Sequence, residues 1–291
     1  MSPLITASQA LSLINGMEAG HSSVSVFDAT FLLPGETYDP DESFLRQRLP
    51  DANRFRIDLF SDPETSLPHM APSQGRFATL AGKIGLTRNS TVILYDQGNV
   101  ASSCRAWWLF RLFGHENVFI IDGGLEAWKA VGGSLHGESD VPASVEDALY
   151  EPLPCFSRLA GAGDVRTALG RSDVIVLDAR SQGRFEGTIP EPRPGVASGH
   201  MPGARNLPYG VLLQPDKCFL PIEILRERLA AKGVDGVRRV IASCGSGMTA
   251  SVIVVAMEAA GFAPGILYDG SWAEWGAIPG LPVVQGPEAA V

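Results

Sequence analysis

The chain contains two copies of one sequence pattern, and this repeat limits what it can fold into more than any other feature. Three matched segments occur twice in the same order along the chain. They are VSVFDA at 24–29 with VIVLDA at 174–179, His-Met at 69–70 with 200–201, and Asp-Gly-x-x-x-x-Trp at 122–128 with 269–275. The sequence therefore predicts two domains of the same fold.

Each copy alternates short β-branched runs with helix-like segments. This alternation is typical of an α/β fold in which a mainly parallel sheet carries helices on both faces. The predicted strands are 24–27, 91–95, 118–121, 174–177, 239–243 and 266–268. The predicted helices are 101–113, 125–131, 222–232 and 249–260, and the first residues of the chain are expected to form a further helix.

A proline-containing segment separates the two copies. Residues 134–157 include Pro142, Pro152 and Pro154 among small and acidic residues, a composition typical of a linker. We therefore expect a domain at 1–140, a linker at 141–157 and a second domain at 158–291. Both domains would then have an ordinary size of roughly 140 residues.

The overall charge and the cysteine usage exclude several classes of protein. The 291 residues contain 23 Lys and Arg against 32 Asp and Glu, and the resulting charge of −9 offers no cationic field for nucleic acid. The four cysteines form no Cys-x-x-Cys pair, which argues against a zinc site and against a disulfide framework. Reduced thiols in a reducing compartment are expected.

The sequence shows no targeting signal and no membrane-spanning segment. The first residues, MSPLITASQALSL, have no Lys or Arg before their apolar stretch and no cleavage pattern of the secretory kind. The longest largely apolar run, at 250–256, is far shorter than the roughly 20 residues that cross a bilayer. We therefore expect a cytoplasmic protein without a membrane partner.

The segment most informative about chemistry is the loop at 244–249, which joins a buried-looking strand to a helix. Gly245 and Gly247 allow the backbone to turn tightly and to direct successive N–H groups inward at the helix N-terminus. Such a nest of amides stabilises anions and favours a thiolate over a thiol at Cys244. The loop therefore predicts a cysteine nucleophile, with a small buried cysteine at a strand end as the alternative.

The residues of this loop argue against three other uses of such a turn. A cysteine-dependent phosphatase has Cys-x5-Arg, but Ala250 stands six residues after Cys244, and Ser243 precedes it where that class has histidine. A nucleotide-binding P-loop ends in Gly-Lys-Ser/Thr, whereas this loop ends in Gly-Met-Thr. A papain-like hydrolase has its histidine after the cysteine, whereas all five histidines precede Cys244.

Several motifs together resemble those of the tandem rhodanese-domain sulfurtransferases. They are Cys-Gly-Ser-Gly-Met-Thr at 244–249, Ser-Gly-His-Met-Pro-Gly-Ala at 198–204, Pro-Glu-Pro-Arg at 190–193 and the repeated Asp-Gly-x-x-x-x-Trp. The likeness covers essentially the whole chain and implies two tandem rhodanese-like domains. Thiosulfate sulfurtransferases of this superfamily usually carry charged residues after the cysteine. The loop instead resembles that of the 3-mercaptopyruvate sulfurtransferases, with Met248 replacing the usual valine.

The resemblance also implies a substrate-binding site. Arg184 and Arg193 match the family's carboxylate- and carbonyl-binding arginines, and a guanidinium presents a planar donor fork that suits such groups. The alternative for each is an exposed arginine in a solvated loop. The loop residues expected to bind the substrate are Gly245, Gly247, Met248 and Thr249. None of them is a cation, which disfavours the thiosulfate dianion as the preferred donor.

The first copy has no nucleophile at the matching position. Aligning TVILYD with RVIASC places Asp96 where Cys244 stands. By resemblance, Asp58 and His69 from the first copy approach Ser246 and form a Ser-His-Asp relay that moves a proton. A turn histidine held by backbone hydrogen bonds is an equally good interpretation of His69.

These features predict a persulfide mechanism. The Cys244 thiolate takes the sulfur of 3-mercaptopyruvate and releases pyruvate, and a thiol acceptor, by resemblance thioredoxin or a small thiol, then removes that sulfur. No metal or organic cofactor is required. One alternative is a thiosulfate:cyanide sulfurtransferase, with thiosulfate as donor and cyanide as acceptor. A second is a non-catalytic rhodanese-like module that binds anions or has a regulatory role.

Overall fold

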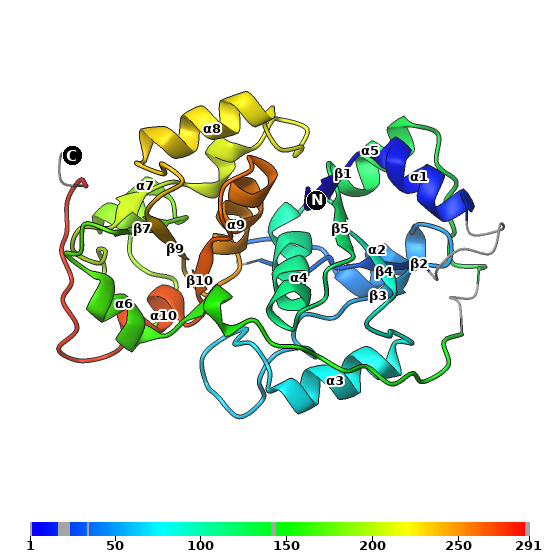
Figure 1. Ribbon diagram of the computed structural model, residues 1–291, viewed down its shortest axis with the longest axis horizontal. Coiled ribbons are helices and arrows are strands. Elements are labelled where there is room, and N and C mark those ends of the chain that lie inside the picture. The colour runs from blue at the N-terminus through cyan, green and yellow to red at the C-terminus, as the bar shows by residue number, and fades with distance from the viewer. Residues whose placement is uncertain (1, 17–23, 34, 141–143, 289–291) are drawn as a thin grey trace. The chain divides into compact units, whose positions relative to one another are not determined.

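The computed structural model describes residues 2–16, 24–33, 35–140 and 144–288. The chain forms two compact units, which Figure 1 shows as ribbons. The N-terminal unit comprises Met1–Ser61, Pro72–Cys155 and Pro215–Cys218, and the C-terminal unit comprises Asp62–Ala71, Phe156–Gln214 and Phe219–Val291. Each unit therefore takes one short segment from the part of the chain that mainly builds the other.

The N-terminal unit is built on a parallel sheet. Its strands are β1 (Leu4–Ile5), β2 (Val24–Asp28), β3 (Asn53–Arg54), β4 (Thr91–Tyr95) and β5 (Val118–Ile121), in the spatial order β1-β5-β4-β2-β3. β2 and β4 pair along their full lengths, from Val24 with Thr91 to Asp28 with Tyr95. Because β4 is central and covered on both faces, its last four residues are all buried.

Helices cover both faces of this sheet. They are α1 (Ala7–Asn15), α2 (Pro40–Arg46), α3 (Gln74–Lys83), α4 (Val100–Leu112) and α5 (Gly124–Ala130). Apolar side chains of α1, α2 and α5 share one core cluster with Val26, Ile93 and Ile121 of the strands. The strand residues between these point to the opposite face of the sheet, where α4 packs. α4 is buried along nearly its whole length, and its Phe110 contacts Phe77 of α3. A helix buried on nearly all sides is typical of a protein interior.

The C-terminal unit repeats this architecture. Its strands are β6 (Leu159–Ala160), β7 (Val174–Asp178), β8 (Arg205–Asn206), β9 (Arg239–Ser243) and β10 (Ile266–Tyr268), in the equivalent spatial order β6-β10-β9-β7-β8. Its helices are α6 (Ala162–Ala168), α7 (Gln182–Glu186), α8 (Ile222–Ala231), α9 (Ala250–Ala259) and α10 (Ser271–Trp275), with 3-10 turns at Phe156–Arg158 and Tyr209–Leu212. All of its strand pairs are parallel. The predicted tandem α/β fold is confirmed.

The central strand β9 lies between two apolar layers. On one face, Ile241 shares a core cluster with Trp272 and Trp275 of α10. α9 also packs against β9, and every residue of α9 except Glu258 is buried. Because both neighbours of the 244–249 loop are anchored in the core, the loop starts and ends at fixed points.

The predicted strands and helices agree closely with the structure. All six strands and all four helices exist, and each predicted boundary lies within one residue of the observed one. The start of the chain differs, since the short strand β1 precedes α1, which begins after a capping box of Thr6 and Gln9. None of the two-residue strands β1, β3, β6 and β8 is predicted from the sequence, because two residues cannot show an alternating pattern.

The segment predicted as a linker is ordered where the structure describes it. Residues 141–143 lie outside the described residues. Beyond them, the amides of Ala148, Leu153 and Cys155 donate to backbone carbonyls at the C-terminal ends of α3 and α4, at 2.9, 3.0 and 2.7 Å. The segment up to Cys155 therefore belongs to the N-terminal unit. The domain limits expected from the sequence remain predictions.

The loop between β4 and α4 holds a buried carboxyl group where the second copy has Cys244. Asp96 directly follows β4. Its Oδ2 accepts a hydrogen bond from Ser103 Oγ at 2.7 Å, and its Oδ1 accepts one from the Gly98 amide at 3.0 Å. Burial raises the pKa of Asp96 to about 6, and the two hydrogen bonds offset only part of that rise. This carboxyl group therefore gains its charge close to neutral pH.

We predict that Asp96→Asn makes the stability of the protein less dependent on pH. The folded state keeps the Asp96 proton in the range where the unfolded chain loses it, so the free energy of unfolding falls as pH rises from about 4 to about 6. The expected loss is roughly 3 kcal/mol. Asparagine can keep both contacts, because its amide group can donate to Ser103 Oγ.

Urea unfolding of the wild type and the variant, at about pH 4 and about pH 7, measures this effect. The variant should gain stability relative to the wild type at the higher pH only. An equal stability difference at both pH values would show that the Asp96 carboxyl does not titrate in this window.

Candidate functional site

The loop 244–249 joins the carboxyl end of β9 to the N-terminus of α9. Cys244 directly follows β9 and is 1% exposed, and Met248 is equally buried. Gly245, Ser246 and Thr249 are partly exposed. Gly247 has a φ of 74°, a left-handed conformation that favours glycine, and this allows the chain to turn back toward α9. The cysteine therefore lies at the base of a tight turn whose middle residues are accessible.

A serine outside the loop holds the turn at both ends. Ser271 Oγ accepts hydrogen bonds from the amides of Cys244 and Gly247, each at 3.1 Å. The same oxygen donates to Tyr268 O at 2.7 Å and lies 3.9 Å from Cys244 Sγ. Ser271 is not among the residues predicted from the sequence, although it lies inside the repeated Asp-Gly motif at 269–275.

The backbone of α10 takes up the first carbonyls of the loop. Trp272 N donates to Cys244 O and Ala273 N donates to Gly245 O, both at 2.9 Å. Among the described residues, the amides of Gly245, Ser246 and Met248 have no hydrogen-bond partner. These amides, rather than those of Cys244 and Gly247, are the ones available to an anion at the loop.

The backbone at Ser271 is strained. Its φ is 50°, and a non-glycine residue adopts this left-handed region only at a cost in free energy. The equivalent residue in the first copy, Gly124, has a φ of 55°, and a Cβ there would lie 2.4 Å from Asp96 O. The first copy therefore uses glycine at the position where the second copy tolerates strain. Strain of this kind is concentrated at functional sites.

An arginine borders the loop on its accessible side. A Cβ at Gly245 would lie 3.0 Å from Arg184 Nη2, so the glycine leaves room for the guanidinium. Arg184 is held by Glu191, through Nη2 to Oε2 at 2.6 Å and Nε to Oε1 at 3.1 Å. The structure thus brings the predicted Arg184 to the predicted loop.

Glu191 also connects Arg184 to the buried core of the unit. Glu191 Oε1 accepts from Arg180 Nη1 at 2.9 Å, and Arg180 in turn pairs with Asp178 at 2.6 Å. The side chains of Arg180 and Asp178 are almost completely buried, and that of Glu191 is 3% exposed. Arg180 also lies 4.2 Å over the Trp272 ring. Two carboxylates and two guanidiniums therefore alternate in one network, which sequence analysis did not predict.

Arg193 follows Glu191 by two residues and is partly exposed. Its guanidinium forms no ion pair or hydrogen bond with another described residue. The short Pro-Glu-Pro-Arg segment therefore supplies one residue that orients Arg184 and one cation that is not neutralised. The predicted role of Arg193 in binding a carbonyl stays a prediction.

His69 belongs to the C-terminal unit, although it comes from the first copy in the sequence. Its segment, 62–71, is closed by a hydrogen bond from Asp62 N to Met70 O. At its end, Ala71 N donates to Oδ2 of the buried Asp269 at 2.6 Å. His69 is partly buried and has a left-handed φ of 59°. The segment is thus fixed to the same Asp-Gly motif that carries Ser271.

Asp58 lies in the N-terminal unit and is exposed. It lines a pocket of about 540 Å³ that also contains Arg54, Arg56 and Arg76. The relay that would join Asp58, His69 and Ser246 remains a prediction.

Two further cysteines and two further histidines lie in surroundings typical of structural residues. Cys104 is buried in α4, and desolvation raises the pKa of its thiol. Burial and nearby aspartates raise the pKa of Cys218 to about 11. His200 stacks on Phe185 with a centroid distance of 3.7 Å, and His115 is buried against Tyr150. No group of three or more His, Cys, Asp or Glu in the described part of the chain is arranged to hold a metal ion.

Curated proteins with similar sequences are sulfurtransferases. The chain is 33% identical over 278 residues to thiosulfate/3-mercaptopyruvate sulfurtransferase 1, mitochondrial, of Arabidopsis thaliana, a span of 89% of this chain and 73% of the relative. It is 35% identical over 262 residues to 3-mercaptopyruvate sulfurtransferase of Escherichia coli (strain K12), covering 89% of this chain and 92% of the relative.

A solved structure resembles the whole fold. The crystal structure of SseA from Escherichia coli, one of the 3-mercaptopyruvate sulfotransferases, matches with a TM-score of 0.78 and 30% identity, covering 94% of this chain and 100% of that chain. The rhodanese-like domain matches this chain twice, at residues 12–131 and 161–278. With one strand order in both of its sheets and one family match for each, the chain belongs to the rhodanese-like domain family and carries that domain in tandem.

Proposed function

We propose that this protein is a sulfurtransferase that moves the sulfur of 3-mercaptopyruvate, through a persulfide on Cys244, to a thiol acceptor. The observation that carries the proposal is the position of Cys244 at the base of a turn held by Ser271, with the Arg184 guanidinium beside the loop. Relatives of similar length that are named 3-mercaptopyruvate sulfurtransferase support the choice of donor.

In the first step, the Cys244 thiolate attacks the sulfur of 3-mercaptopyruvate. A sulfur–sulfur bond forms, and the carbon–sulfur bond breaks with its electron pair remaining on carbon, so that pyruvate leaves as its enolate. The proton of the substrate thiol can then move to that carbon, which gives pyruvate. Ser246, with His69 and Asp58, is the proposed route for this proton.

The donor would be held by arginine side chains at one end of the site and by backbone N–H groups at the other. Arg184 and Arg193 would hold the carboxylate and the ketone oxygen, which fixes the sulfur in front of the thiolate. The unpaired amides of Gly245, Ser246 and Met248 would stabilise the negative persulfide. Because Glu191 already takes two donors of Arg184, the substrate meets a guanidinium whose orientation is set before it binds.

In the second step, the thiolate of an acceptor attacks the outer sulfur of the persulfide. The sulfur–sulfur bond breaks, Cys244 leaves as a thiolate, and the acceptor becomes the persulfide. Thioredoxin or a small thiol is the proposed acceptor. The proposed place of this reaction is the cytoplasm. None of the described helices combines the length and apolarity that crossing a bilayer requires.

Thiosulfate is the second candidate donor, with cyanide as acceptor. One relative is named for both thiosulfate and 3-mercaptopyruvate, which favours some activity with each. No residue between Gly245 and Thr249 is a cation, so the loop itself offers a dianion only its amides, whereas the carboxylate and the ketone of 3-mercaptopyruvate suit the donor forks of Arg184 and Arg193. A comparison of kcat/KM for the two donors tests the preference, and a higher value for thiosulfate would overturn it.

Intact-mass spectrometry of the purified protein after addition of 3-mercaptopyruvate tests the persulfide. The wild type should gain the mass of one sulfur atom, and a thiol acceptor should remove it. Cys244→Ser should gain nothing, whereas Cys155→Ser, the same change at a partly exposed cysteine outside the loop, should gain the sulfur as the wild type does. A wild type that gains no mass would favour a non-catalytic, anion-binding or regulatory module.

We predict that Arg184→Ala and Arg193→Ala each lower kcat/KM for 3-mercaptopyruvate by at least about tenfold, since each removes a charge-assisted contact to the donor. Turnover of thiosulfate should fall less, because thiosulfate has no carboxylate or ketone for these arginines to bind. Steady-state kinetics with both donors measures the two effects. Equal losses with both donors, accompanied by a lower melting temperature, would indicate general destabilisation instead.

We predict that Ser271→Ala slows persulfide formation and lowers stability. The change leaves the amides of Cys244 and Gly247 without their acceptor, at roughly 1–3 kcal/mol for each buried group. Ser271→Gly removes the same hydroxyl but relieves the left-handed strain, so it should recover about 1 kcal/mol of stability without recovering the rate.

Thermal unfolding and single-turnover mass spectrometry of both variants check this pair of effects. A Ser271→Ala protein that forms the persulfide at the wild-type rate would show that the hydroxyl does not position the nucleophile.

A further inference from the structure

The carboxylate of Glu191 lies directly against the cation that borders the candidate active site. The nitrogen of Arg184 nearest to Gly245 is Nη2, and the same nitrogen donates to Glu191 Oε2 at 2.6 Å. The Glu191 side chain is 3% exposed, so neither water nor salt screens its charge well. A sulfur donor that meets Arg184 therefore also meets a fixed negative charge next to it.

This negative charge is not needed to neutralise the other arginine of the network. Arg180 already pairs with Asp178, which accepts from Nε at 3.0 and 3.1 Å and from Nη2 at 2.6 Å. Glu191 takes only one further donor of Arg180, Nη1 at 2.9 Å. Because Asp178 supplies the counter-charge of Arg180, the charge of Glu191 acts mainly on Arg184.

The network belongs to the site rather than to the fold. The first copy has Thr30 where the second copy has Arg180, in each case two residues after the matched aspartate. In the first copy that aspartate, Asp28, pairs instead with Arg54 of the neighbouring strand β3, at 3.1 Å. The copy without a nucleophile therefore keeps the buried aspartate but not the chain of charges that ends beside the loop.

The charges proposed to surround the donor leave only a small positive excess. In the buried network, two carboxylates offset the two guanidiniums. Arg193 then supplies the positive charge of this set that is not offset, and the Cys244 thiolate of the proposed mechanism opposes it. The interaction energy of a donor with the site scales with the charge of the donor. Removing a negative charge from the site therefore favours a dianion about twice as strongly as a monoanion.

We propose that Glu191 is a specificity-determining residue, whose carboxylate makes the site favour monoanionic sulfur donors over dianionic ones. This role rests on the proposed function, because it concerns the donor of the same site. 3-Mercaptopyruvate carries one negative charge at neutral pH, since its thiol stays protonated, whereas thiosulfate carries two. Glu191 therefore acts in two ways. It orients Arg184, and it reduces the gain that a second negative charge on the donor would bring.

Persulfide formation from thiosulfate and from methanethiosulfonate, followed by single-turnover mass spectrometry, tests this role. Both donors carry the sulfur on a sulfonyl group, and they differ by one negative charge. Glu191→Gln removes the charge of the side chain and keeps its length. It should raise the ratio of the second-order rate constants, thiosulfate over methanethiosulfonate, by at least about tenfold. Glu191→Asp keeps the charge and shortens the side chain, so its ratio should stay within about threefold of the wild-type value.

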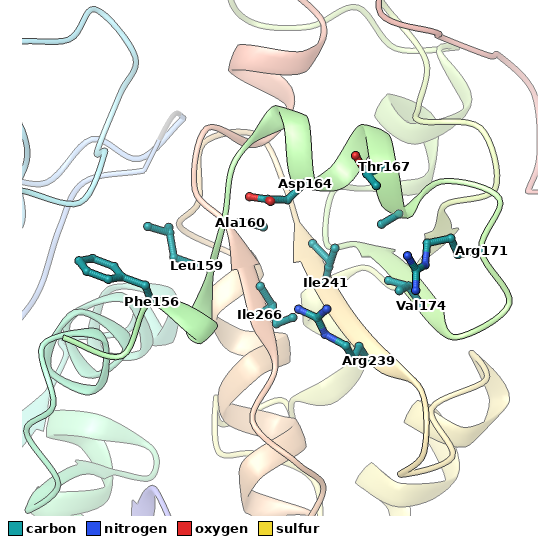
Figure 2. A pocket seen from close by; sticks show the side chains of 11 residues that line it. Phe156, Leu159, Ala160, Asp164, Thr167, Arg171, Val174, Arg239, Ile241 and Ile266 are labelled. Atoms are coloured by element: carbon teal, nitrogen blue, oxygen red, sulfur yellow. The ribbon is translucent and has the colours of Figure 1, made fainter.

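Asp173→Asn is the matched control, since it also removes a carboxylate that pairs with an arginine. Asp173 pairs with Arg171 at 2.7 Å, and both side chains are more than half exposed. Figure 2 shows Arg171 at a pocket by the amino ends of the strands, whereas the loop 244–249 follows the carboxyl end of β9. Distance and solvent screen this charge from the donor, so the ratio for Asp173→Asn should equal that of the wild type.

Two unreactive anions test the wild type without any substitution. Methanesulfonate should inhibit persulfide formation at least as strongly as sulfate, although sulfate carries twice the charge. Stronger inhibition by sulfate would overturn the role of Glu191, as would a ratio that shifts equally in Glu191→Gln and Glu191→Asp or in neither. A wild type that gains no sulfur from any donor would instead overturn the proposed function, and the role of Glu191 with it.

Discussion

The position of Cys244 depends on a single serine hydroxyl shared between two amides. Ser271 Oγ accepts from Cys244 and Gly247, so it closes the turn around the sulfur, and it donates to Tyr268 O at the end of β10. Buried amides that lack an acceptor are costly, so this one oxygen selects one conformation of the loop. The left-handed backbone of Ser271 is the strain that accompanies this arrangement. The rest of the site, from the α10 amides to Arg184 beside Gly245, is arranged around a turn fixed in this way.

The two copies of the domain show which parts of this arrangement belong to the fold and which belong to the site. In both copies, the helix after the last strand donates an amide to the first carbonyl of the loop, from Leu125 to Asp96 and from Trp272 to Cys244. That contact belongs to the fold. The second copy adds a serine where the first has Gly124, and a thiol where the first has a carboxyl. In the first copy the buried Asp96 instead accepts hydrogen bonds from Ser103 and Gly98, and this carboxyl carries no substrate chemistry in the proposed mechanism.

Local patterns in the sequence were sufficient for the longer strands and for the loop. Alternating apolar runs and the Gly-rich turn report on neighbours in the chain, so β9, α9 and Cys244 could be predicted. The roles of Glu191 and Ser271 depend on partners 7 and 24–27 residues away, which no spacing rule connects. The four two-residue strands are held by their neighbours in the sheet and have no pattern of their own. The membership of His69 in the C-terminal unit also arises from contacts across the chain, such as the one between Ala71 and Asp269.

The exchange of short segments makes the two copies interdependent. Segment 62–71 comes from the first half of the chain but completes the C-terminal unit, and segment 215–218 comes from the second half but completes the N-terminal unit. A cut in the linker would therefore remove from the C-terminal half the amide of Ala71 that satisfies the buried Asp269. Neither half of the chain is therefore a self-contained module, because a replacement for the first half would also have to supply a segment that fits the C-terminal unit.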